Sequence, residues 1–264
     1  MKYTRVLFLL LLNLKSFSQQ DSLSILRNKL LTEGIDLYNS QAACWNAADL
    51  LLQKENGKNI AGYFSYKQDS VIKTVFYTDK EKVIATYTFK PPVSVESYSV
   101  DLKSRKLTEY ESALAKVRHA AFELLNYDFK FFKRPENSSF YVIMLDKGEE
   151  VHVFIIVGPK VKGAILLGND YLMRYKKSDA SLIDKKVLNP DVINLKTIKE
   201  THYNYVTYTQ ENPALPYISS TNICSLLLYS LQTEWSTYKV ESKTHLSVFN
   251  AKTKLLTITP LPKK

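Results

Sequence analysis

The residues best suited to chemistry in this 264-residue chain lie in one segment, residues 200–229. Glu200, His202 and Asn204 alternate along a run that favours a strand, so their side chains would share one face. After a polar loop that contains prolines, Ser219 leads into an apolar run that predicts a buried helix. No other segment of the chain suggests a reactive site as much as this one. Its order is a strand with alternating polar residues, a loop, a serine and a buried helix.

This order resembles the motif of the JAB/MPN metallopeptidases. In that family a His-x-His pair on a strand and an Asp at a helix start hold zinc. A Ser three residues before that Asp stabilises the oxyanion, and a Glu from another strand is the general base. His202 matches the first His and Ser219 matches the Ser, but Asn204 replaces the second His and Asn222 replaces the Asp. The resemblance is confined to residues 200–229, and the loop between Asn204 and Ser219 is longer than in compact members.

The two asparagines change what the resemblance implies. Zinc sites use three or four His, Cys or carboxylate ligands, and two neutral amides beside His202 donate too weakly to replace them. We therefore expect no bound metal, no cofactor and no retained hydrolysis, and no Glu can be matched as the base. The structural alternative is that Ser219 or Ser220 is the N-cap of a helix over residues 221–232.

A second, weaker candidate for binding is Asp170. Residues 168–171 read Gly-Asn-Asp-Tyr between two strand-like runs, which favours a tight turn over a binding role for the carboxylate. Around it, residues 160–186 carry seven bases against three acids. Lysines that protect the edge of a sheet from pairing would explain this excess of bases. The alternative explanation is a basic face that serves surface adhesion.

Two cysteines, Cys44 and Cys224, are present. In an oxidising compartment they could form a disulfide, whereas their apolar helical surroundings favour two buried free thiols. Catalytic signatures such as GxSxG, HExxH, CxxC or a glycine-rich phosphate loop do not occur in the sequence.

Residues 1–18 have the pattern of a signal peptide. Lys2 and Arg5 precede the apolar run 6–12, and small residues at 16–18 suit a signal peptidase. We expect a mature protein that begins near Gln19 and is exported to the periplasm or the medium. No lipoprotein cysteine and no transmembrane segment are expected.

Composition indicates a globular protein with a basic surface. The chain is 45% hydrophobic with 18 tyrosines and a formal net charge of +10, which falls to about +7 when the three bases of the signal are removed. Such a charge suits an anionic envelope or polysaccharide surface, or another envelope protein, as partner. Nucleic acid is a poor fit for an exported chain without a nucleic-acid module.

The pattern along the chain predicts an α+β fold of mostly antiparallel meanders with three to four helices. Two helical stretches come first, followed by three strands and a stiff Pro91-Pro92 exit. Thr108 and Glu111 form a capping box at the start of a helix over residues 108–127, and further hairpins follow it. We expect either a helical hairpin with a meander in 19–92 and a larger region in 93–264, or one continuous domain from 19 to 264.

The chain as a whole is similar to the uncharacterised secreted families of Gram-negative bacteria. A non-catalytic binding or scaffold role in the cell envelope is the function that these observations favour. The alternative is an inactive relative of the JAB/MPN metallopeptidases.

Overall fold

The structure is a computed structural model that describes residues 2–53, 59–161, 163–196, 205–230, 233 and 235–262, with the backbone alone for residues 2–21 and Lys196. Within these residues it contains three helices and thirteen strands in three sheets, and most strand pairs are antiparallel. The predicted α+β class is confirmed.

The first sheet has the order β1-β2-β3-β4, with β5 beside β3. Its first three strands are the predicted meander. The strands that follow Pro91-Pro92 also pair with β3, so this sheet continues beyond the predicted division at residue 92. The bounds are β1 Gly62–Gln68, β2 Val71–Tyr77, β3 Lys82–Phe89, β4 Tyr98–Asp101 and β5 Arg105–Lys106.

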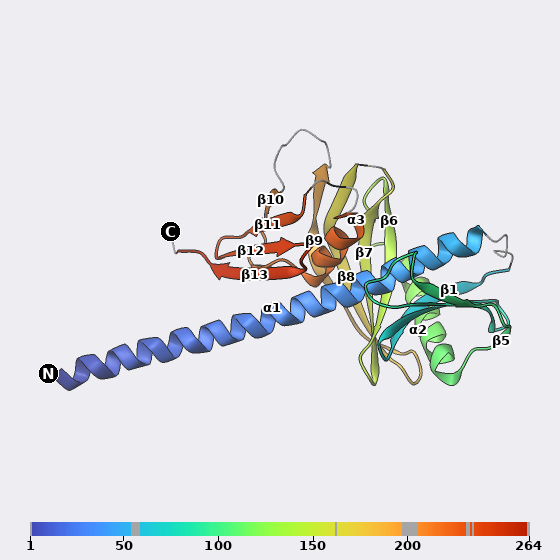
Figure 1. The fold of residues 1–264 in the computed structure, drawn as a ribbon, viewed down its shortest axis with the longest axis horizontal. Coiled ribbons are helices and arrows are strands. Elements are labelled where there is room, and N and C mark those ends of the chain that lie inside the picture. Colours follow the sequence, from blue (N-terminus) through green and yellow to red (C-terminus); the bar gives the residue numbers. More distant parts are fainter. Residues whose placement is uncertain are drawn as a thin grey trace.

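A single helix, α1 (Lys2–Leu52), replaces the two predicted helices, so the helical hairpin expected in residues 19–92 is wrong. The two apolar stripes are separated by Gly34 and by no proline, and one glycine weakens a helix without ending it. Gly34 instead lets a second helix approach, because a Cβ there would lie 2.7 Å from Cβ of Ile223. Figure 1 shows α1 running the length of the molecule, with its amino-terminal part projecting beyond the sheets.

The second sheet is an antiparallel meander of four strands in chain order. The predicted turn at residues 168–171 is wrong, because β8 continues through it and the register shifts there instead. Gly168 and Asn169 have φ values of +80° and +52°, and a Cβ on Gly168 would lie 2.0 Å from the Asp191 carbonyl oxygen. Their positive φ angles therefore make a bulge within the strand. The strands are β6 Ser138–Asp146, β7 Glu150–Pro159, β8 Ala164–Lys176 and β9 Leu182–Lys196.

Helix α2 (Glu109–Tyr127) confirms the predicted capping box. The Thr108 hydroxyl accepts from the Glu111 backbone N–H at 3.1 Å, and the Thr108 N–H donates to the Glu111 carboxylate at 2.9 Å. The apolar stripe of α2, including Leu114, Val117 and Ala121, is buried in a core shared with the first and second sheets.

The third sheet is interrupted in the chain by a helix. Helix α3 (Ser220–Tyr229) follows the first strand of this sheet and precedes the second. The order is β10-β11-β12-β13, in which β10 and β11 are parallel and the remaining pairs form the predicted carboxyl-terminal meander. A parallel pair requires a crossover, and α3 lies in that connection. The strands are β10 Tyr205–Thr209, β11 Thr237–Glu241, β12 His245–Asn250 and β13 Leu255–Pro260.

Helix α1 packs against α3 and against strands of all three sheets, so it joins the layers. Cys44 and Cys224 are both buried free thiols, as the apolar surroundings favoured. Among the described residues, no helix combines the length and the apolar character that crossing a bilayer requires.

Candidate functional site

The structure describes three of the five predicted site residues. Ser219 and Asn222 begin α3, and Asp170 lies in the bulge of β8. His202 and Asn204 lie outside the described residues. The structure brings Asp170 and the start of α3 together through Thr221, and we call Asp170, Tyr208, Ser219, Thr221 and Asn222 the buried cluster.

Ser219 has the structural role that its sequence context allowed. It is the N-cap of α3, and its hydroxyl accepts a hydrogen bond of 3.0 Å from the Asn222 backbone N–H. The same hydroxyl lies 2.8 Å from Oγ1 of Thr221. Because the Thr221 hydroxyl donates its one hydrogen to Asp170, the Ser219 hydroxyl must be the donor in this contact. A chain of hydrogen bonds thus runs from the helix start to the Asp170 carboxylate.

The row of hydrogen bonds ends at Asp170, which lies in the protein interior. Its side chain is 1% exposed, and Oδ2 accepts from Thr221 at 2.6 Å. Burial raises the pKa of Asp170 to about 7, against the lowering effects of Thr221 and the Val157 backbone. Within the described part of the chain, Oδ1 has no hydrogen-bond partner. A carboxyl group so placed is mainly neutral below pH 7.

Asn222 is held on the other side of the cluster. Its Nδ2 donates to the Tyr208 hydroxyl at 3.0 Å, and both side chains are buried. Burial also raises the pKa of Tyr208, and Asp170 adds to that effect. Among the described residues, no group of three or more His, Cys, Asp or Glu side chains could hold a metal ion. The buried cluster therefore pins α3 to β8 and β10 through hydrogen bonds.

A second region, which the sequence did not predict as a site, is open to solvent. Two hollows of about 420 Å³ and about 620 Å³ lie on either side of the β1–β2 turn and share Lys67 and Asp69. We call them together the hairpin groove. Its walls come from α1, from the β1–β2 and β6–β7 hairpins, and from the start of α2.

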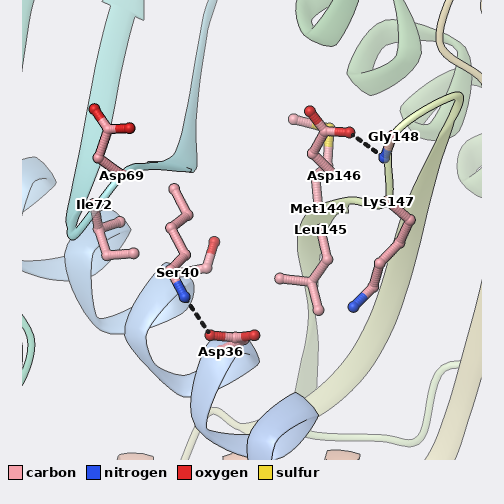
Figure 2. A pocket seen from close by; sticks show the side chains of 10 residues that line it. Asp36, Ser40, Asp69, Ile72, Met144, Leu145, Asp146, Lys147 and Gly148 are labelled. Carbon is pink, nitrogen blue, oxygen red and sulfur yellow. Dashed lines mark hydrogen bonds and ion pairs between the residues drawn. The ribbon is translucent and has the colours of Figure 1, made fainter.

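The smaller hollow places acidic groups from three elements around one space. Figure 2 shows Asp36 on α1, with Asp69 and Asp146 coming from the two hairpins on opposite sides. Asp36 pairs with Lys67 at 3.5 Å. Asp146 accepts from the Tyr110 hydroxyl at 2.8 Å and from the Gly148 N–H at 2.9 Å.

The larger hollow is built around a buried carboxylate. Arg105 donates to both oxygens of Glu111, at 2.5 and 2.8 Å, and Tyr66 donates to Oε1 at 2.9 Å. Burial acts to raise the pKa of Glu111, but the hydrogen bonds from Arg105, Thr108 and Tyr66 outweigh it and leave that pKa below its usual value. Tyr66 and Tyr110 meet edge to face at 5.3 Å between ring centroids. This wall is therefore a fixed aromatic and ionic surface.

Parts of the hairpin groove were visible in the sequence, but not as a site. Asp69 lies in the β1–β2 turn and Asp146 ends β6, and Glu111 was predicted only as a capping residue. Their meeting depends on how the first two sheets pack, with β1 next to β6, and no local pattern encodes that contact.

The basic residues between 160 and 186 do not form one face. Lys160 lies in the β7–β8 turn, whereas Lys176 and Lys177 follow at the other end of β8. Thirteen residues of strand separate them, roughly 40 Å. Arg174 forms an ion pair with Asp184 at 2.6 Å, and Lys177 forms one with Asp146 at 3.1 Å. Within the described residues, the bases of this stretch are therefore divided between the two ends of β8, and two of them are paired with acids.

Comparisons with known proteins give no family. No protein-family model matches the chain, and no curated protein matches it. A solved structure with some similarity is the "Bacillus megaterium YpeB C-terminal domain". The match has 11% sequence identity and a TM-score of 0.22, and it covers 84% of this chain and 97% of that one. A TM-score of this size does not establish a shared fold.

Proposed function

We propose that this chain is an exported protein of the cell envelope with a non-catalytic binding role, and that the hairpin groove receives its ligand. The observation that carries the proposal is the meeting of α1, two hairpins and the start of α2 around a pair of adjoining hollows lined by both charges and by tyrosines. Convergent polar groups on a preformed concave surface are typical of ligand sites. Export rests on the signal peptide predicted for residues 1–18.

The state of the carboxylates supports binding rather than catalysis. A general base must be free to take a proton from the substrate. Glu111 instead accepts hydrogen bonds from Arg105, Tyr66 and the Thr108 N–H, and Asp146 accepts from Lys177, Tyr110 and Gly148. These groups are held in place as parts of a rigid surface.

The larger hollow favours an acidic saccharide as ligand. Tyr110 is half-buried beside the buried Tyr66 ring, and it offers part of its own ring surface for the apolar side of a sugar to pack against. Lys67 and Lys73 line the same hollow, and the Lys67 side chain is 59% exposed. Ammonium groups beside a ring surface suit uronic acid units, and the net charge of about +7 that remains without the predicted signal attracts a polyanion. This ligand class agrees with the anionic envelope surface expected from composition.

A second candidate function is supported by the buried cluster. Ser219 and Asn222 stand at the start of a buried helix, as the resemblance to JAB/MPN metallopeptidases requires, and Asp170 lies next to them. The Ser219 hydroxyl accepts a hydrogen bond as the N-cap of α3. This second candidate function is therefore that of an inactive relative of the JAB/MPN metallopeptidases.

Calorimetric titration with oligogalacturonate fragments, at low salt, tests the first proposal. We expect binding that weakens as NaCl screens the charges, and no binding of neutral dextran fragments. The double variant Lys67→Glu/Lys73→Glu should bind at least about tenfold more weakly, which corresponds to about 1.4 kcal/mol.

A matched control carries the same charge change away from the groove. Lys243→Glu/Lys252→Glu alters two exposed lysines in the turns of the third sheet, so it should bind like the wild type. Equal losses in the two double variants would show that net charge, and not the hairpin groove, attracts the polyanion.

A further inference from the structure

Strand β9 forms an open edge of the second sheet. It pairs with β8, and within the described residues no other strand lies beside it. The outward N–H and C=O groups of an edge strand are a template for pairing with another strand. Pro190 within β9 has no N–H to donate, and before it the register with β8 is regular only from Asp184 to Val187, so pairing is best supported over residues 183–187.

This edge exposes apolar side chains on either side of Asp184, Lys185 and Lys186. Leu182, Ile183 and Val187 are 41%, 39% and 42% exposed. Tyr127, at 87% exposed, adjoins this edge, because Tyr127 and Leu182 line one open hollow of about 730 Å³. Contiguous exposed apolar residues beside an open strand edge mark an interaction surface.

The sequence of the edge is complementary to itself. If two copies pair antiparallel with Lys185 opposite Lys185, then Ile183 lies opposite Val187 and Asp184 lies opposite Lys186. Each pairing occurs twice, as a two-fold axis requires. Apolar pairs and opposite charges placed directly across two strands both stabilise a sheet. Asp184 already pairs with Arg174 of its own chain at 2.6 Å, but its side chain stays 45% exposed, so it can also receive Lys186 of a second copy. The strand therefore fits a second copy of itself in charge and in apolar pattern.

The one unfavourable pairing, Lys185 with Lys185, is already compensated within each copy. The Lys185 ammonium pairs with the Asp128 carboxylate. It also lies over the Phe131 ring, 4.5 Å from the ring centroid. Because a carboxylate of its own chain neutralises each lysine, the two ammonium groups meet without a net like-charge repulsion.

We infer that β9 is a dimerisation strand, and that two copies of this chain pair antiparallel along residues 183–187. The second sheets of the two copies then form one continuous sheet across a two-fold axis. The side chain of Tyr127, beside Leu182, borders this paired edge and loses exposure in the dimer.

Sedimentation velocity on two charge variants tests this pairing. We expect a wild-type dimer whose share rises with protein concentration. Lys186→Glu sets Glu against Asp184 of the other copy, and Asp184→Lys sets Lys against Lys186, so each variant alone should be monomeric. An equimolar mixture restores two opposite-charge pairs and should form a heterodimer.

The mixture separates a specific interface from a loss of folding, since misfolded chains would not recover by mixing. Lys252→Glu, in the β12–β13 turn, is the matched control and should dimerise like the wild type. A wild type that stays monomeric at the highest concentration, or a dimer unaffected by both β9 variants, would overturn the inference.

Discussion

The Thr221 hydroxyl donates a hydrogen bond of 2.6 Å to Oδ2 of Asp170, and this contact ties the first turn of α3 to the bulge of β8. The register of β8 shifts at this point, and Asp170 is 1% exposed in the middle of a strand whose residues are buried on both faces.

Replacing Asp170 with Asn should change how stability depends on pH. The pKa of Asp170 is raised to about 7 in the folded protein, so the folded state holds this proton more tightly than the unfolded state. The resulting stabilisation is complete below about pH 4 and is lost as the pH rises to about 7. Asp170→Asn lacks this fall and should be more stable than the wild type at pH 8, by up to about 4 kcal/mol.

Urea unfolding of both proteins from pH 4 to pH 8 measures the difference directly. Other carboxyl groups, such as Glu111 with its lowered pKa, contribute equally to both curves and cancel. Parallel curves for the wild type and the variant would contradict the assignment of a raised pKa to Asp170.

Asn222→Asp tests the alternative function. The change adds a second carboxyl group to the buried cluster, where Asn222 now donates to the Tyr208 hydroxyl. A buried charge without a cation is costly, so we expect a lower thermal midpoint at pH 8. The control Asn250→Asp places the same group in a partly exposed turn, where its oxygen still accepts from the Lys252 and Thr253 N–H groups.

Zinc titration of Asn222→Asp combined with Asn204→His completes this test. We expect no stoichiometric zinc in the wild type or in the double variant. Tight binding of one zinc ion by the double variant would instead support the arrangement of the JAB/MPN metallopeptidases.

Gly168→Ala should be far more destabilising than Gly148→Ala. Both glycines have positive φ, +80° and +86°, so both variants carry a similar backbone cost. Only at Gly168 would the new Cβ meet an atom, the Asp191 carbonyl oxygen at 2.0 Å, whereas Gly148 has open space. Thermal unfolding of the pair isolates the contact, and equal midpoints would mean that the bulge adapts.

Leu227→Asp should unfold the protein, while Lys176→Asp should be tolerated. Leu227 is buried in α3 with 5% exposure, and an uncompensated carboxylate there costs several kcal/mol, comparable to the stability of a domain. Lys176 is exposed at the end of β8, where substitutions usually change stability by about 0.5 kcal/mol. Circular dichroism melting compares the two, and similar midpoints would show that α3 is not part of the core.

The local parts of the fold could be predicted from the sequence. The Thr108–Glu111 capping box, the hairpin turns and the apolar run of α3 each depend on neighbouring residues alone. Gly34 marks the limit of such reasoning, because it lies between two apolar stripes of one helix and is required by the close approach of Ile223 on another helix. The hairpin groove was out of reach for the same reason, since its walls meet only when β1 packs beside β6.

Amide chemical-shift mapping during titration with oligogalacturonate is the most direct test of the central claim. If the hairpin groove is the binding site, the largest changes will fall on residues 66–73, 105–111 and 144–148, and the changes will be lost in Lys67→Glu/Lys73→Glu. Changes confined to the third sheet, or spread evenly over the basic surface, would contradict the claim.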